Sequence, residues 1–120
     1  PAVLLRLNPE LAVYLFQVGR ESLFALEEEL EVKICLQVDP ELHRTTIDLK
    51  PSKEVISPSF QPRNTIEVEI KEQFNEEEVL TWVEGWLIVV PGSKELIGQQ
   101  VEIKIRETNR LINRAIRQKN

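Results

Sequence analysis

The hydrophobic pattern of the chain is strongest in residues 82–105, where two kinds of strand follow one another. Residues 86–91 form a continuous apolar run rich in β-branched residues, which is typical of a buried strand. Pro91 and Gly92 end this run, because proline has no N–H to donate to a sheet ladder. A second strand opens at Gly98, and its residues 101–106 alternate between apolar and charged side chains; this period predicts a strand with one face in the core and one in water.

The first half of the chain predicts one strand followed by a helical region. Residues 2–7 are short and apolar enough for a strand, and residues 8–10 supply an Asn N-cap, a Pro at the first helical position and an acidic first turn. Apolar positions recur at helical spacing before Gly19 and again in residues 23–30. The helical region is therefore either two helices or one helix bent near Gly19.

Two short segments after the helical region are predicted to be strands. Residues 32–38 alternate toward the β period, Asp39 and Pro40 make a turn, and residues 45–49 give the next strand. The order of elements expected for residues 1–50 is therefore βα(α)ββ.

Residues 51–63 differ in composition from the segments on either side. They contain three prolines and three serines, a composition that supports neither a helical nor a strand period. We interpret this segment as a linker between a unit of residues 1–50 and a second unit of residues 64–120.

The second unit is predicted to be a small β-barrel. Residues 65–71 alternate strictly, an acidic loop follows at residues 72–78, and residues 79–83 begin the next strand. Five short strands in about 55 residues are typical of a small barrel. Residues 111–116 leave two alternatives open, because their apolar spacing suits a helix whereas closing a barrel needs a strand. The whole chain is therefore predicted to be an α+β protein.

Four segments between residues 64 and 117 carry a resemblance to a known family: TIEVEIKE, EGWLIVVPG, IGQQVEIKI and the closing NRAIRQ. Together they resemble a TRAM domain, the small OB-like barrel attached to RNA-modifying enzymes and to PIN-domain nucleases. The resemblance implies a five-stranded OB-like β-barrel that binds RNA.

The first half carries two weaker resemblances. A helix, a break at residues 18–21, a helix ending in EEELEVKI and a following strand resemble the parts of a KH-like unit. The same stretch, residues 9–43, is also similar to a segment near the end of the RNase E/G catalytic core, where it is structural. We therefore expect residues 1–50 to form a KH-like unit, with the RNase E/G segment as the alternative.

Charge is distributed unevenly along the chain. With 20 acidic against 15 basic residues, the net charge of −5 argues against a protein that coats nucleic acid over its whole surface. The end of the chain is nevertheless basic, and basic side chains neutralise phosphates and release counterions. We therefore predict RNA contacts there, with a solvated chain end as the alternative; the residues are Lys104, Arg106, Arg110, Arg114, Arg117 and Lys119.

Two aromatic residues are candidates for stacking on RNA bases. An exposed aromatic ring contributes about 1–3 kcal/mol per stacked base. Trp82 and Phe74 are the candidates, and Phe74 is expected to be more exposed than Phe60 because it lies in the acidic loop. Trp86 is expected in the core, since burial is the commoner fate of tryptophan.

Catalytic and metal chemistry are not indicated by the sequence. One cysteine, Cys35, and one histidine, His43, cannot complete a four-ligand zinc site. The acidic residues at positions 27–29 and 31 point to different sides of a helix and are expected to form a solvated face. We therefore predict no catalytic residue, no metal and no cofactor for this stretch.

These observations predict a single-stranded RNA-binding module, the accessory C-terminal part of a larger RNA-processing nuclease or ATPase. The opening on PAVLLRL suggests a piece of a longer protein, so that a catalytic domain is expected outside it. No stretch approaches the roughly 18 to 20 apolar residues that span a bilayer, and no secretory leader is visible, so we expect a cytoplasmic location and no membrane partner. The alternatives are a structural or protein-interaction module whose acidic surface binds a partner, or a fragment of an RNase E/G-type endoribonuclease.

Overall fold

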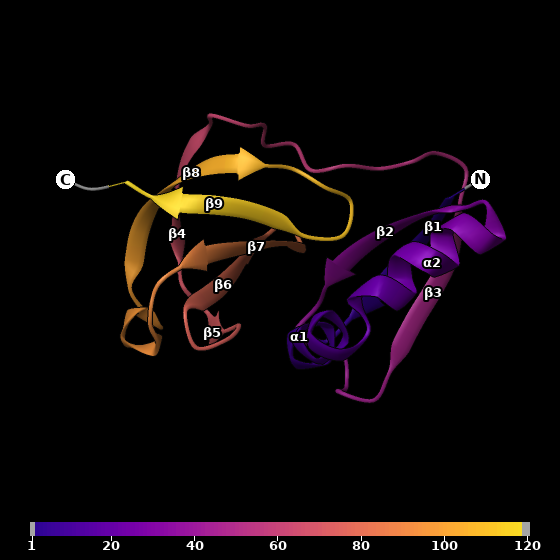
Figure 1. The fold of residues 1–120 in the computed structure, drawn as a ribbon, viewed down its shortest axis with the longest axis horizontal. Coiled ribbons are helices and arrows are strands. Elements are labelled where there is room, and N and C mark those ends of the chain that lie inside the picture. Colours follow the sequence, from indigo (N-terminus) through magenta and orange to yellow (C-terminus); the bar gives the residue numbers. More distant parts are fainter. Residues whose placement is uncertain (1, 119–120) are drawn as a thin grey trace. The chain divides into compact units, whose positions relative to one another are not determined.

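The computed structural model describes residues 2–118, and the chain divides into two compact units (Figure 1). We call Pro1–Ser57 the N-terminal unit and Pro58–Asn120 the C-terminal unit. The chain is a mixed α+β protein, with two helices in the first unit and a curled β-sheet in the second.

The N-terminal unit has the predicted order of strand, helix, helix, strand and strand. Its elements are β1 (Ala2–Leu7), α1 (Pro9–Val18), α2 (Arg20–Leu30), β2 (Lys33–Val38) and β3 (Ile47–Ser52). The open question at Gly19 is resolved as two helices, since Gly19 lies between them and its N–H donates to the carbonyl of Leu15 at 2.7 Å.

Local sequence explains where α1 begins. The Asn8 side-chain oxygen accepts the N–H of Glu10 at 2.9 Å, and Pro9 occupies the first helical position, as predicted. The Asn8 amide also donates to the carbonyl of Leu42 at 2.9 Å. The cap of the helix is thereby tied to the turn that leads into β3.

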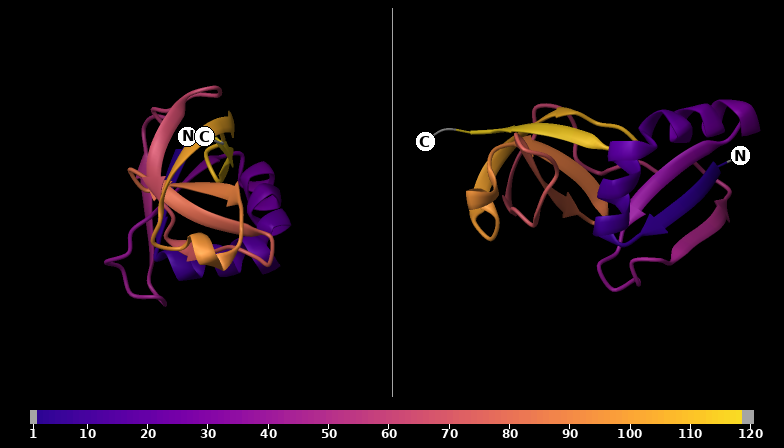
Figure 2. Two further views of the ribbon diagram at one scale, coloured as in Figure 1. Left: turned by 90° about the vertical axis from the view of Figure 1, so that its left-hand side faces the viewer. Right: turned by 60° about the horizontal axis from the view of Figure 1, so that its bottom comes forward.

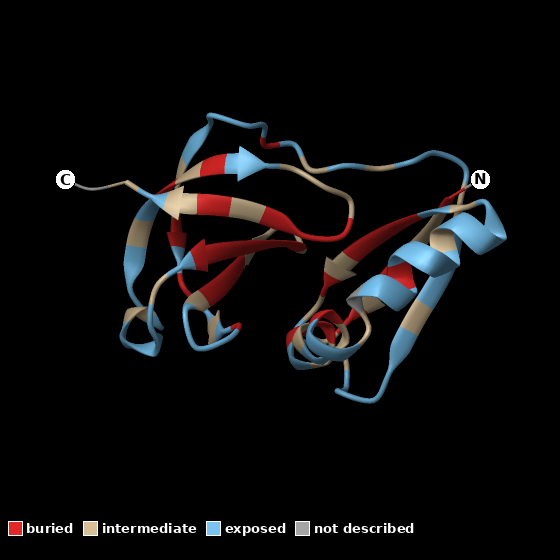
Figure 3. Cartoon of the chain, in the orientation of Figure 1, coloured by how far each residue is buried: buried red, intermediate tan, exposed pale blue. Residues whose placement is uncertain are grey.

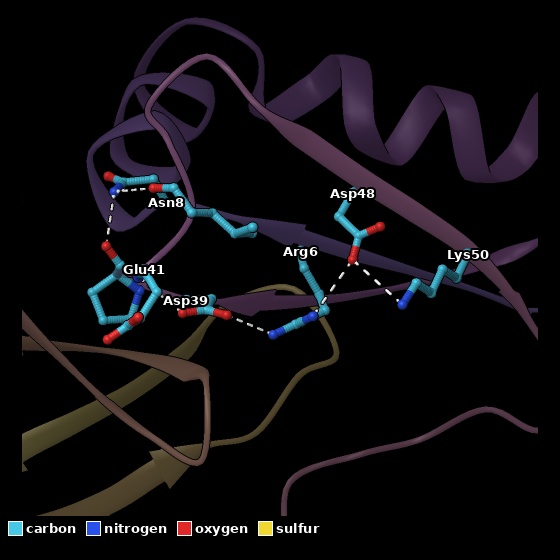
Figure 4. Close-up of polar contacts among 8 residues, drawn as sticks. Arg6, Asn8, Asp39, Glu41, Asp48 and Lys50 are labelled. Atoms are coloured by element: carbon cyan, nitrogen blue, oxygen red, sulfur yellow. Dashed lines mark hydrogen bonds and ion pairs between the residues drawn. The ribbon is translucent and has the colours of Figure 1, made fainter.

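In the sheet of the N-terminal unit, β1 lies between β2, which is parallel to it, and β3, which is antiparallel. Buried apolar side chains alternate along its strands and form the core; they are Leu5, Leu7, Ile34, Leu36 and Val38. Arg6 lies on the opposite face, where its guanidinium contacts Asp39 at 2.6 Å and Asp48 at 3.5 Å (Figure 4). One face of this sheet is therefore apolar and the other holds ion pairs.

The strand β3 begins two residues later and ends three residues later than the predicted strand at residues 45–49. It continues through Pro51 and Ser52, which pair with Val3 and Ala2 of β1 and which we had assigned to the linker. Proline is tolerated here because β3 is an edge strand within the described sheet, where one side of the backbone needs no donor.

The C-terminal unit is one curled sheet (Figures 1 and 2). Its strands pair in the order β4-β8-β9-β7-β6-β5, and only β7 and β9 run parallel. The open question at residues 111–116 is resolved in favour of a strand, since β9 covers most of this segment. The elements are β4 (Thr65–Glu69), β5 (Glu72–Gln73), β6 (Glu78–Val83), β7 (Trp86–Pro91), a 3₁₀ turn η1 (Lys94–Leu96), β8 (Gln100–Glu107) and β9 (Asn113–Arg117).

The two edges of this sheet are two parts of one bent segment. β4 pairs with β8, and β5, which follows after only Ile70 and Lys71, pairs with β6 at the other edge. The bend itself is held from both sides, because Ile70 donates to Gln99 and Lys71 donates to Leu80, each at 3.0 Å. The strand predicted at residues 65–71 is therefore shorter, and its continuation raises the number of strands from the expected five to six.

Strands β6 and β7 form an antiparallel hairpin in the middle of this unit. The turn between β6 and β7 consists of Glu84 and Gly85, whose φ angles of 52° and 84° match a tight turn of the primed type. Trp86 is 4% exposed and belongs to the core, as expected (Figure 3 shows β7 almost entirely buried). Because Trp82 faces Leu87 and Val83 faces Trp86 across the ladder, the two tryptophans lie on opposite faces of the hairpin.

Candidate nucleic-acid interface

The basic residues predicted to contact RNA lie mainly on two neighbouring strands. Lys104 and Arg106 belong to β8, Arg114 and Arg117 to β9, and Arg110 to the loop that joins them. Lys119 lies outside the described residues. Because β8 and β9 are antiparallel partners, the fold brings the five described residues into one region of the C-terminal unit.

The alternation along β8 places its cations on the outer face. Ile103 and Ile105 are fully buried, whereas Lys104 between them is half-buried and Arg106 is exposed. The ladder continues from Ile105 to Glu107 across a register shift, so Arg106 is the extra residue of a β-bulge. The extra residue of a bulge is left outside the ladder, and Arg106 is exposed at this point.

Arg114 differs from the other cations because it already has a charged partner. Its Nη1 lies 2.9 Å from Oε2 of Glu78, the first residue of β6, and the two side chains are 34% and 25% exposed. Pro91, Arg106 and other residues complete a shallow hollow of about 300 Å³ around this pair. Arg114 thus joins the acidic loop to the basic strands, and an RNA phosphate would compete with Glu78 for it.

Of the two stacking candidates, only Trp82 is accessible. Trp82 is half-buried, and the ammonium of Lys71 lies 5.9 Å from its ring centroid, within the range of a cation–π contact. Lys71 also pairs with Glu69 at 3.6 Å. The ring of Trp82 is therefore partly open to a base and has a cation beside it.

The expectation that Phe74 is exposed is wrong, since this residue is 8% exposed. The acidic loop is a tight turn in which Phe74 and Asn75 both donate to the carbonyl of Glu78, at 2.9 and 3.1 Å. This turn places the Phe74 ring in the core while Glu76 and Glu77 remain exposed. Phe60, the other phenylalanine weighed at this point, is also buried.

One basic residue of this region was missed by the sequence analysis. Arg63 was assigned to the linker, but its N–H donates to the carbonyl of Ile105 at 2.8 Å and it lines a hollow together with Lys104 and Arg106. The sequence offered one indication of this role. Arg63 lies two residues before the strictly alternating strand, close enough to contact the partner of that strand.

The acidic helix face of the N-terminal unit was expected to be solvated throughout, and one of its four glutamates departs from this. Glu28, Glu29 and Glu31 are exposed, but Oε2 of Glu27 accepts the N–H of Ile34 at 2.7 Å. Glu27 therefore links α2 to β2 and has a structural role. The reason is positional, since it lies one turn before the end of α2, where the chain turns back into the sheet.

Three further features of residues 2–118 concern metal binding, the cysteine and membrane spans. No three His, Cys, Asp or Glu side chains gather there into a group that could hold a metal ion. Cys35 is buried, and its thiol contacts the carbonyl of Ile56 at 3.3 Å, as a small core residue would. Among the helices of this part of the chain, none is long and apolar enough to cross a membrane.

The C-terminal unit corresponds to a known domain family. Residues 60–115 match the TRAM domain family model, which covers nearly the whole curled sheet and includes Arg63. TRAM domains are generally RNA-binding modules. No curated protein matches the chain.

Proposed function

We propose that this chain is a single-stranded RNA-binding module whose RNA lies along β8 and β9. The observation that carries the proposal is the match of residues 60–115 to the TRAM domain. The geometry supports it, because exposed or half-buried cations collect on these two strands in a chain whose net charge is −5. In such a chain, phosphate is attracted only where the charge is locally reversed.

Phosphate contacts would be made by the cations that have no acidic partner among the described residues. Lys104, Arg106 and Arg117 meet this condition, whereas Arg114 is paired with Glu78. Each phosphate neutralised on a single strand contributes about 0.7 to the slope of log affinity against log salt. The proposed interface therefore predicts binding that weakens steeply as salt is added.

Base contacts would come from Trp82. In this proposal the curled sheet is an OB-like barrel, and barrels of that kind bind oligonucleotides on the face of their second and third strands. When the bent β4–β5 segment is counted as the first strand, the second and third strands are β6 and β7, and Trp82 lies on β6. A base stacked on its ring would contribute about 1–3 kcal/mol without selecting a sequence.

The larger setting of the module is also part of the proposal. We infer an accessory role in a larger RNA-processing nuclease or ATPase of the cytoplasm, with the catalytic groups supplied by another domain. The resemblance of the N-terminal unit to a KH-like unit stays a prediction, as does its similarity to the RNase E/G core.

The test is fluorescence anisotropy of a short labelled single-stranded RNA at salt concentrations between about 50 and 200 mM, where phosphate contacts have a large effect. Replacing Lys104, Arg106 and Arg117 together by Gln is expected to weaken binding and to reduce the salt slope by about 2. The matched control removes three cations from the N-terminal unit, Arg44, Lys50 and Lys53, and should change both quantities much less. Undetectable wild-type binding at low salt, or equal losses in the two triple variants, would contradict the proposal.

A second candidate function is protein interaction through the N-terminal unit. It is favoured by the exposed large hydrophobic side chains of that unit, which include Tyr14, Val18 and Leu30 at 57–64% exposure. Concentration-dependent self-association of the full chain, or a missing RNA complex in the experiment above, would favour this candidate.

A further inference from the structure

Three cations from two separate segments meet at one hollow of the C-terminal unit. Arg63 precedes β4, and Lys104 and Arg106 lie at the end of β8. Together with Pro62 and Ile105 they line an open hollow of about 410 Å³. The fold therefore places a residue of the segment before the sheet beside two cations from near its end.

The backbone holds Arg63 firmly at this position. Its N–H donates to the carbonyl of Ile105, and the N–H of Ile105 donates to the carbonyl of Asn64, both at 2.8 Å. The side-chain oxygen of Asn64 accepts the N–H of Gln61, also at 2.8 Å. The turn that carries Arg63 is thus fixed to β8 before any ligand arrives.

Arg63 also has an unusual backbone conformation. Its φ is 77°, in the left-handed region that residues other than glycine rarely adopt. A long charged side chain has no intrinsic preference for this region, and such conformations persist only where the surroundings impose them. Strained positions of this kind cluster at binding sites, so the conformation is consistent with a ligand contact at Arg63.

The charges at the hollow are not balanced by the protein. Within the described residues, none of Arg63, Lys104 and Arg106 forms an ion pair, although the chain has 20 acidic residues. Like charges that share a hollow repel one another, and an anion placed between them would relieve this repulsion. Arginine guanidinium groups suit a phosphate because their planar N–H donors match its oxygens.

We propose that this hollow binds a phosphate group of the RNA backbone, with Arg63 as its third cation. The inference rests on the proposed function and sharpens it, because it adds a contact outside the basic chain end. It also places the RNA over the ladder between residues 63–65 and β8. Pro62 also lines the hollow and gives the adjoining sugar an apolar contact.

Two substitutions at Arg63 separate its charge from its conformation. Arg63→Asn removes the charge and keeps a residue that tolerates positive φ, whereas Arg63→Lys keeps the charge. We expect Arg63→Asn to weaken RNA binding several-fold and to lower the salt slope by about 0.7, and Arg63→Lys to keep the slope. The thermal midpoint of Arg63→Asn should equal or exceed that of the wild type. Lys94→Gln, which removes an exposed cation of η1 in the same unit, is the control and should leave binding unchanged.

A second measurement uses inorganic tripolyphosphate, which carries the same phosphate chemistry without bases or sugars. Its addition to the full chain should shift the NMR signals of the Arg63 and Ile105 amides, and these shifts should be lost in Arg63→Asn. If the wild type binds RNA and Arg63→Asn binds it with the same affinity and salt slope, the hollow is not a phosphate site, while the proposed function stands. If tripolyphosphate shifts these amides and no RNA binds, RNA is overturned as the source of the phosphate, and the proposed function fails with it.

Discussion

The two units of this protein differ in how many of their large hydrophobic side chains are exposed. Among the described residues, the N-terminal unit exposes eight large hydrophobic side chains and the C-terminal unit exposes one, Ile97. In the C-terminal unit the sheet curls until its two edges are formed by one bent segment, so its inner face is enclosed by its own strands. In the N-terminal unit, Ile47 and Leu49 on β3 remain about 60% exposed, and within residues 21–30 of α2 only Leu23 is buried. The curled sheet covers most of its own apolar side chains, whereas the sheet of the N-terminal unit, covered by two short helices, leaves an apolar margin exposed.

The units also differ in charge. Residues 1–57 contain ten acidic and six basic residues, whereas residues 58–120 contain ten acidic and nine basic ones. The nearly balanced unit is the one in which cations collect on one pair of strands. Long-range repulsion of phosphate is therefore stronger at the N-terminal unit, which argues that the two units have different partners.

The largest expected effect comes from opening the closed core. Trp86→Ala should lower the free energy of unfolding of the C-terminal unit by about 3–5 kcal/mol, because a fully buried indole is replaced by a cavity. Phe24→Ala in α2 should cost about 1 kcal/mol or less, since that ring is 39% exposed. Urea unfolding followed by circular dichroism measures both. Similar losses of unfolding free energy in the two variants would mean that the two units bury their large side chains to a similar extent.

A smaller effect is expected from a buried polar group of the C-terminal unit. The Asn113 side chain donates to the carbonyl of Leu87 at 2.8 Å and accepts the N–H of Asn109 at 2.7 Å. Asn113→Ala should cost about 1–3 kcal/mol, because two buried backbone groups lose their partner. Asn75→Ala, at an exposed loop, is the control and should cost below about 1 kcal/mol. Hydrogen exchange at the Asn109 amide should accelerate in the first variant only.

In the N-terminal unit, neighbouring glutamates should behave differently. Glu27→Ala removes the acceptor of the Ile34 N–H and is expected to cost about 1–2 kcal/mol, whereas Glu28→Ala should stay within about 0.5 kcal/mol. The two residues have the same helix propensity, so the difference in urea midpoint reports the side-chain contacts of Glu27, which include this hydrogen bond. Equal midpoints would mean that Glu27 contributes no more to stability than an exposed glutamate of the helix face.

The smallest effect on stability is expected at the apolar margin itself. Leu49→Thr should change the free energy of unfolding by no more than about 0.5 kcal/mol, since the side chain is already exposed and threonine suits a strand. If this margin binds a protein partner or a second copy, the same variant should lower the association constant in analytical ultracentrifugation. A large loss of stability would show that Leu49 belongs to the core.

Features encoded by neighbouring residues were predicted correctly from the sequence. The cap at Asn8 depends on Pro9 and Glu10, so local chemistry alone decides it. The burial of Ile103 and Ile105 follows from their period of two along β8.

Features that depend on distant partners were not predictable in the same way. The bend after Glu69 exists because its two sides bond to Gln99 and Leu80, which lie far along the chain. The Phe74 ring is buried because a tight turn directs it into a core that other strands build. Arg63 was hidden for the same reason, since its bonding partner in β8 cannot be read from the proline-rich segment around it.

The bent segment also sets the order in which the C-terminal unit can assemble. The β6–β7 hairpin joins neighbours in sequence and can form in about 1–10 μs. β4 leaves the ribosome before that hairpin, yet its partner β8 is made only afterwards, and closing so long a loop is entropically costly and slow. During this interval Ile66 and Val68 have no sheet to pack against. β4 is therefore the segment most exposed to wrong pairing during synthesis, and only the arrival of β8 ends that exposure.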